Sequence, residues 1–176
     1  MKIRGDVSPK KPHKNRNAQG GATLIEVLIS LLILAIGLLG MSGLQTVGLR
    51  NTQSAYLRTQ ATIASNDIVE RVRANLQGVE AASYNNNAGA VTAACNTLVG
   101  CDFAELAAND VAEWKGSLAA DFPVGAGTVC SDSTPEDGTS AAPACDGIGT
   151  MYAVKIWWDE DRDGVAEKRF SLSFQP

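Results

Sequence analysis

The sequence predicts an α+β protein in which one long helix packs its second half on a small antiparallel β-sheet. Three observations predict this class. An apolar run covers residues 20–44, helical spacing of apolar residues continues to about residue 77, and two stretches near the end of the 176-residue chain alternate apolar and polar residues. Intervals of three or four indicate an amphipathic helix, whereas strict alternation indicates a strand. A helix followed by a group of strands is typical of the α+β class.

The first 21 residues form a basic leader. They carry six Lys or Arg and one Asp, a net charge of +5, whereas the whole chain has −4, so the residues from Ala22 onward carry −9. Rich in Lys, Asn, Pro and Gly, residues 1–21 cannot bury a core, and we expect a disordered segment on the cytoplasmic side. The acidic remainder lacks the basic surface that nucleic acid requires, so no nucleic-acid partner is expected.

An apolar stem is predicted over residues 22–49. These 28 residues would extend about 42 Å as a helix, which spans a bilayer with room to tilt. Glu26 is the only charged residue between Arg16 and Arg50. A lone ionisable group at bilayer depth is costly, so a function is the default interpretation of Glu26.

Four glycines interrupt the stem, and each costs roughly 1 kcal/mol relative to Ala in a water-exposed helix. They are compatible with two interpretations. Small residues allow helices to approach closely in membranes, and they also mark segments that loosen when a filament assembles. Close packing is the interpretation we favour. The glycines are Gly37, Gly40, Gly43 and Gly48.

Residues 50–78 continue the same helix as an amphipathic segment. Its charged positions indicate a solvated face, because exposed ion pairs are individually weak. Gly78 is placed to end the helix as a C′ residue. One helix is therefore predicted from about Ala22 to Gln77, roughly 80 Å long. Its apolar stripe consists of Leu57, Ala61, Ala64, Ile68, Val72 and Leu76.

Residues 79–176 form the predicted globular head. Residues 79–94 lack periodicity and indicate a loop. Asp102 and Glu105 have the spacing of a capping box at the start of a short second helix that ends before Pro123. The core-facing stripe predicted for this helix is Phe103, Ala107, Val111, Trp114 and Leu118.

The end of the chain predicts the sheet. Residues 151–158 place Tyr152, Val154, Ile156 and Trp158 on one face, and residues 168–174 place Phe170, Leu172 and Phe174 on one face. The two runs can form a hairpin, and residues 124–130 can add a third strand. The apolar face of this antiparallel sheet can then cover the amphipathic half of the long helix.

The head contains four cysteines and no histidine, since the only histidine is His13. An even number of cysteines outside the cytoplasm indicates disulfides. Spacing favours Cys95 with Cys101 and Cys130 with Cys145, although four cysteines allow three connectivities. The chain lacks a CxxC pair and has no histidine beyond His13, which excludes a zinc site of known spacing and a His-dependent catalytic triad in the head.

An acidic turn joins the last two strands and partly resembles a calcium loop of the form D-x-D-x-D-G. The twelfth position is Phe170 in place of the usual bidentate glutamate, and no helix pair flanks the loop. An acidic turn that serves hairpin geometry is the alternative, and it is favoured. No other cofactor is expected. The calcium ligands would be Asp159, Asp161, Asp163, the Val165 carbonyl and Glu167.

A processing signal precedes the stem, with Gly20-Gly21 followed by ATLIEVL. This order, with the small-residue site before the apolar segment, resembles the class III signal of type IV prepilins and pseudopilins. The resemblance implies that prepilin peptidase cleaves after Gly21, that Ala22 is N-methylated, and that Glu26 becomes the fifth mature residue. The family usually begins its mature chain with Phe or Met, so Ala22 departs from the pattern. Glu26 could pair with its own new amino terminus or, as the family implies, with that of a neighbouring subunit.

The wider chain looks like a minor pilin of the PilV type. The resemblance lies in the stem, the cysteine-flanked loop, the AEWKGSL segment and the terminal IWWDEDRDG. It implies a subunit that first resides in the inner membrane, with its amino terminus cytoplasmic and its head periplasmic, and then joins the cell-surface pilus. The implied partners are the major pilin, other minor pilins, prepilin peptidase, the inner-membrane assembly platform and, before assembly, membrane lipid.

Two other classes compete with this interpretation. A minor pseudopilin of a type II secretion system would share the processing signal and Glu26. A signal-anchored periplasmic enzyme or binding domain is the second. The head offers no pair of nucleophile and base and no Gly-rich phosphate loop, so we do not expect an enzyme.

Overall fold

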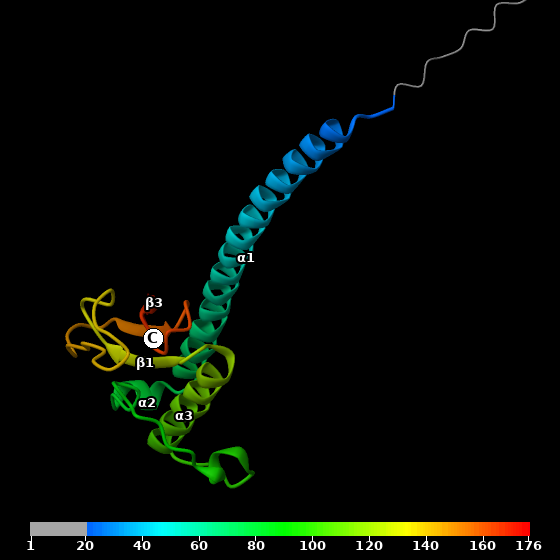
Figure 1. Cartoon of the computed structure of the whole chain (residues 1–176). Helices are drawn as coiled ribbons and strands as arrows, with labels where there is room; N and C mark the ends of the chain where they lie inside the picture. Colours follow the sequence, from blue (N-terminus) through cyan, green and yellow to red (C-terminus); the bar gives the residue numbers. More distant parts are fainter. Residues whose placement is uncertain (1–20) are drawn as a thin grey trace, which may run out of the picture. The chain divides into compact units, whose positions relative to one another are not determined.

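The computed structural model describes residues 21–176 (Figure 1). Apart from Gly21, the predicted leader lies outside the described residues. The fold is α+β and pilin-like, as predicted, with a long apolar helix, a short extra helix and a three-stranded antiparallel sheet. Its elements are α1 (Leu24–Ala74), α2 (Leu76–Glu80), the 3-10 helix η1 (Ala93–Asn96), α3 (Phe103–Asp121), β1 (Ala126–Ser131), β2 (Tyr152–Trp158) and β3 (Lys168–Phe174).

The chain divides into two compact units, with the boundary between Thr46 and Val47. Helix α1 contributes to both. It contains no proline, and several of its hydroxyl groups bond within the helix: Ser30 donates to the Glu26 carbonyl at 2.8 Å, and Thr52 donates to the Gly48 carbonyl at 2.9 Å. This bonding to the carbonyl four residues earlier allows polar side chains to occupy an apolar helix.

Helix α1 ends at Ala74, so the prediction that Gly78 terminates it is wrong. Asn75 leaves helical geometry, and its side-chain oxygen accepts a hydrogen bond from the Gly78 N–H at 3.1 Å, which starts the short helix α2. The amide nitrogen of Asn75 donates to the Phe103 carbonyl at 2.8 Å. Because of this break, Leu76 is 60% exposed and does not join the predicted core stripe.

Replacing Gly78 with alanine should destabilise the head by about 1 to 2 kcal/mol. A Cβ atom at this position would lie 2.6 Å from the amide nitrogen of Asn75 and would displace the side chain that caps α2. Chemical denaturation of the full chain in detergent measures the effect. Gly116→Ala is the matched control, because a Cβ there meets nothing within 4 Å. It should stabilise α3 by up to about 1 kcal/mol, and equal effects of the two substitutions would contradict the capping role.

Helix α3 begins as predicted, because Asp102 and Glu105 form a complete capping box. Trp114 is 1% exposed, and its indole N–H donates to the Ala64 carbonyl of α1 at 2.9 Å. Phe103 departs from the predicted stripe, since it is 40% exposed in the first turn. The buried residues of the stripe are Ala107, Val111, Trp114 and Leu118.

Arg71 of α1 makes a specific contact with α3. The sequence had indicated only that the charged residues of this segment face solvent. Its guanidinium lies 3.3 Å from the carboxylate of Asp110 and 3.0 Å from that of Glu113, both on α3. Asp110 also accepts a hydrogen bond from the Tyr84 hydroxyl at 2.7 Å. These polar contacts fix how α3 packs on α1.

The sheet has the order β1-β2-β3, and both strand pairs are antiparallel. Phe170 pairs with Ile156 and Phe174 with Tyr152, which confirms the predicted hairpin. Helix α3 lies close against β1, where a Cβ at Gly127 would meet the Trp114 ring at 2.6 Å (Figure 1). All seven residues of β2 are buried, so this strand is covered on both faces and not only on its apolar face.

Candidate functional site

The predicted processing segment lies at the start of α1. Gly21, Ala22 and Thr23 precede the helix and are exposed, whereas Gly20 lies outside the described residues. The Thr23 carbonyl accepts hydrogen bonds from the N–H groups of Glu26 at 3.0 Å and Val27 at 3.2 Å. The helix therefore begins at Leu24, three residues after Gly21 at the predicted cleavage site. Glu26 stands in the first turn, where the helix dipole favours a negative charge.

The stem has no partner within the described chain. One described helix, α1, is long and apolar enough to cross a membrane, and its most apolar 18-residue window has a mean hydropathy of 2.6 with none of it buried. A Cβ atom at any of the four stem glycines would meet nothing within 4 Å. The small size of these glycines therefore serves no contact inside the described chain. Glycines 37, 40, 43 and 48 lie within one continuous helix.

The fold and the stem together define a pilin-like protein. Residues 16–42 match the family model of the prokaryotic N-terminal methylation motif, a match that includes Gly20, Gly21, Ala22 and Glu26. The motif indicates a member of the type IV pilin or pseudopilin family, processed by prepilin peptidase and assembled into pilus-like fibres. It points to a structural protein and not to an enzyme. No curated protein and no solved structure matches the chain significantly.

The four cysteines form two disulfides in the pairing that the spacing favours. The Cα atoms of Cys95 and Cys101 are 4.8 Å apart, and those of Cys130 and Cys145 are 6.1 Å apart. The first disulfide closes a short loop whose tip exposes Leu98 fully. The second closes the polar loop of residues 131–144, which begins where β1 ends.

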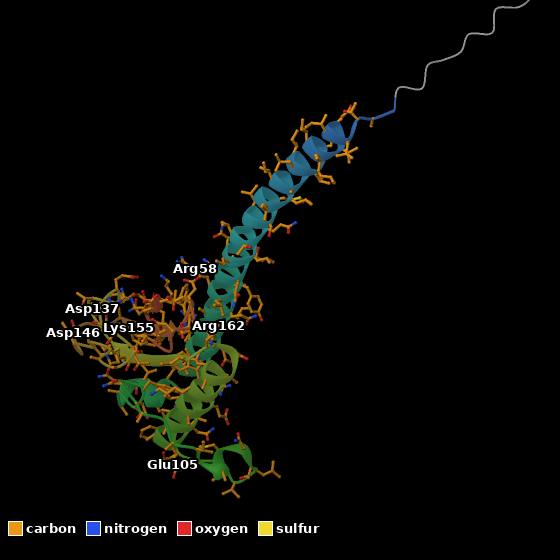
Figure 2. All side chains as sticks on the ribbon, in the orientation of Figure 1. Arg58, Glu105, Asp137, Asp146, Lys155 and Arg162 are labelled. Atoms are coloured by element: carbon orange, nitrogen blue, oxygen red, sulfur yellow. A yellow bond between two sulfur atoms is a disulfide. The ribbon has the colours of Figure 1, made fainter. Side chains whose placement is uncertain are left out.

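Lys155 holds that polar loop against the sheet. It lies in the middle of β2, and its side chain has no solvent exposure. The Lys155 ammonium is 2.5 Å from the Asp132 carboxylate and 2.8 Å from the Asp137 carboxylate, and it donates to the Pro143 carbonyl at 2.8 Å. Figure 2 shows Lys155 near Asp137 of this loop and near Asp146, which lies just beyond it. Burial lowers the pKa of Lys155, but hydrogen bonds from the ammonium to Asp132 and Asp137 more than offset this effect, and the pKa is raised.

A second cation from the sheet supports the same loop. Arg169 of β3 donates to the Gly138 carbonyl at 3.0 Å and to the Glu136 carbonyl. The loop thus replaces apolar packing with hydrogen bonds from two strand cations. The alternating pattern gave Lys155 no partner and did not indicate this site. A lone lysine inside the apolar run MYAVKIWW is the signal that could have indicated it.

Cys130→Ser should destabilise the head by about 3 kcal/mol, the chain-entropy value for a loop of this length. The sequence separation of the two cysteines is 15 residues. Thermal melting and limited proteolysis of the full chain measure the change. Cys95→Ser opens a separation of only 6 residues and should cost less, about 2 kcal/mol. Unchanged melting and unchanged proteolysis in Cys130→Ser would contradict the role of this disulfide.

The acidic turn between β2 and β3 brings three carboxylates together, since oxygen atoms of Asp159, Asp161 and Asp163 lie within 4.8 Å of one another. Asp159 is 3% exposed and accepts hydrogen bonds from the N–H groups of Arg162 at 2.6 Å and Gly164 at 2.8 Å. Burial opposes ionisation of Asp159, but these backbone hydrogen bonds outweigh burial and lower its pKa. The turn therefore uses both oxygens of Asp159 for its own geometry.

The other predicted calcium ligands are also engaged. Asp163 accepts from the Val165 N–H at 2.8 Å, and the Val165 carbonyl accepts from the Glu167 N–H at 3.1 Å. Glu167 itself lies 3.8 Å from the Lys168 ammonium. Calcium binding at this turn stays a prediction.

Isothermal titration of the full chain with calcium should show binding no tighter than about millimolar, the weak end of the calcium-site range. The reason is that the carboxylates already serve the backbone of the turn. Asp161→Asn should abolish any heat of calcium binding at this site. Asp161 suits this test because it is exposed and, of the three carboxylates, contributes least to the turn, accepting one hydrogen bond at 3.3 Å. Glu105→Gln, remote in the capping box, is the control. Micromolar affinity would contradict the turn interpretation.

Proposed function

We propose that this protein is a minor pilin of a type IV pilus, of the PilV type, that acts in a priming or tip complex and supports twitching motility and adhesion. The observation that carries the proposal is Glu26. It is the only ionisable residue of the stem, it stands in the first helical turn, and it lies four residues after Ala22. A neighbouring amino terminus can neutralise this carboxylate once the stems pack together.

The proposed subunit has two successive locations. Before assembly the stem spans the inner membrane, with the basic leader cytoplasmic and the head periplasmic, and lipid surrounds the stem. After processing, the stem packs among the stems of the major pilin and other minor pilins in the fibre. The assembly platform of the inner membrane transfers the subunit between the two locations.

Mass spectrometry of sheared surface pili tests this proposal. The expected result is a chain that begins at methylated Ala22, present in small amounts beside the major pilin. A Gly21→Leu variant, which removes the small residue at the cleavage site, should remain in the membrane fraction with its leader attached. If the processed chain is missing from purified pili, the pilin assignment is wrong.

A deletion strain separates the pilin from a minor pseudopilin, because both carry the same N-terminal motif. Loss of surface pili and twitching with intact protein secretion supports the pilin. The reverse result supports a type II secretion pseudopilin.

A further inference from the structure

A pocket of about 540 Å³ lies within the unit of residues 47–176, between α1 and the acidic turn. The turn brings Arg162 beside α1 (Figure 2). One wall is the turn of α1 that follows the stem, and the other is the turn between β2 and β3. The lining residues are Arg50, Asn51, Gln53, Ser54, Glu160, Asp161 and Arg162.

The pocket contains charges of both signs that are largely free to bind a ligand. Among residues 21–176, neither Arg50 nor Arg162 lies within ion-pair distance of a carboxylate, and the side chains of Asn51, Gln53 and Ser54 make no hydrogen bond to the rest of the described chain. Glu160 contacts one cation, Lys168, at 3.8 Å. The pocket therefore offers a guanidinium from each wall, amide donors from α1 and carboxylate acceptors from the acidic turn.

The backbone holds Arg162 in place at a conformational cost. Its φ angle is 65°, in the left-handed region that non-glycine residues rarely adopt. The Asp159 carboxylate stabilises this conformation by accepting the Arg162 N–H at 2.6 Å. A strained residue that its surroundings hold in position suggests a functional placement.

The chain places this pocket next to the end of the stem. Arg50 directly follows Leu49, the last large apolar residue of the stem. When residues 22–49 span a bilayer, an arginine at this position reaches the headgroup layer, since long cationic side chains extend to the interface. Arg50 therefore meets lipid phosphates while the subunit is in the membrane.

We propose that this pocket binds the zwitterionic headgroup of a phosphatidylethanolamine-type lipid in the outer leaflet of the inner membrane. This inference rests on the membrane stage of the proposed function. Arg50 and Arg162 bind the phosphate, because guanidinium groups match phosphate oxygens in charge and geometry. Glu160 and Asp161 accept hydrogen bonds from the primary ammonium. The occupied pocket holds the head at the membrane surface until the stem is extracted.

The charge pattern also defines the specificity. Phosphatidylglycerol supplies the phosphate but leaves Glu160 and Asp161 without a cation, and like charges oppose its binding. Phosphatidylcholine carries a cation that has no N–H to donate to a carboxylate. The pocket should therefore prefer the ethanolamine headgroup to both.

Native mass spectrometry of the full chain, released from nanodiscs with equal amounts of phosphatidylethanolamine and phosphatidylglycerol, tests the proposal. We expect phosphatidylethanolamine to be retained about tenfold more than phosphatidylglycerol, as expected when one charged hydrogen-bonded contact is gained. Arg162→Gln and Arg50→Gln should each remove most of this retention. Glu160→Gln should reduce the preference between the two lipids. Arg58→Gln is the matched control, because Arg58 is an exposed arginine of α1 outside the pocket.

Resistance of the chain to alkaline extraction from the same membranes is measured in parallel. Two results would overturn the headgroup site and leave the pilin proposal intact. One is a wild-type chain that inserts but retains both lipids equally. The other is an Arg162→Gln variant that retains as much phosphatidylethanolamine as the wild type. A chain that fails to insert overturns the membrane stage of the proposed function itself. If the arginine variants lower incorporation into pili without changing lipid retention, the pocket contacts a neighbouring subunit and the lipid site is wrong.

Discussion

Replacing Lys155 with methionine should destabilise the head by about 3 to 5 kcal/mol, the cost of leaving a buried charge without its partner. The Asp132 carboxylate has no solvent exposure and lies 2.5 Å from the Lys155 ammonium. Methionine keeps much of the length of the side chain but supplies no donor, so Asp132 and the Pro143 carbonyl lose their contact. Chemical denaturation of the full chain in detergent measures the loss.

Two further variants define the origin of the effect. Lys168→Met on the neighbouring strand is the matched control, because Lys168 is exposed and its nearest carboxylates are 3.8 Å away. Exposed pairs of this kind contribute at most about 1 kcal/mol. In the Lys155→Met background, Asp132→Asn should recover part of the lost stability by removing the unpaired charge. Equal effects of Lys155→Met and Lys168→Met would contradict the buried ion pair.

The same cluster should contribute to acid sensitivity. The hydrogen bond from Lys155 is the largest of the effects that lower the pKa of Asp137 below its usual range. A depressed carboxylate pKa stabilises the fold above the ordinary pKa of Asp, and this stabilisation is lost as the pH falls through the lowered value. Lys155→Met should therefore reduce the decrease in stability that the wild-type head shows on acidification.

Glu26→Ala should lower incorporation into the fibre by at least about a hundredfold while cleavage after Gly21 continues. In the proposed assembly the amino group of Ala22 loses its carboxylate partner among apolar stems, at a cost of about 3 to 5 kcal/mol, and each 1.4 kcal/mol is a factor of ten. The ratio of processed chain in sheared pili to processed chain in membranes measures incorporation. The mass of the amino-terminal peptide reports cleavage.

Ser30→Ala is the matched control for this stem substitution. Ser30 lies one turn beyond Glu26, and its hydroxyl donates to the Glu26 carbonyl within the same helix. Its removal changes polarity without removing charge, so incorporation should stay close to that of the wild type. Normal incorporation of Glu26→Ala would contradict pairing between Glu26 and an amino terminus, although the processing signal would stand.

Local chemistry explains the elements that were predicted correctly. The capping box of Asp102 and Glu105 involves residues within one turn, so the sequence suffices to place the start of α3. The hairpin of β2 and β3 follows from alternating apolar residues on both sides of a turn. Cys130 and Cys145 are adjacent cysteines in the sequence, and the structure confirms the disulfide between them.

The errors have a different origin. Gly78 looked like a helix terminator because glycine is typical of that position, yet Asn75 ends the helix by bonding to Phe103 and Gly78 together. Lys155 was assigned no contact, because the alternating pattern marks only the apolar face of its strand. The loop that covers it carries almost no apolar residue, so a rule based on apolar burial gives no indication of contact.

The sequence by itself determined the stem, its single carboxylate Glu26, the processing signal before it and the α+β class. Only the tertiary structure decided which polar groups are buried. It alone shows that Lys155 holds the disulfide-closed loop and that Arg162 and Arg50 line one pocket. The physical reason is that periodicity reports how one element divides between water and core. A buried ion pair or a binding pocket depends on partners from distant segments, and their packing alone brings them together.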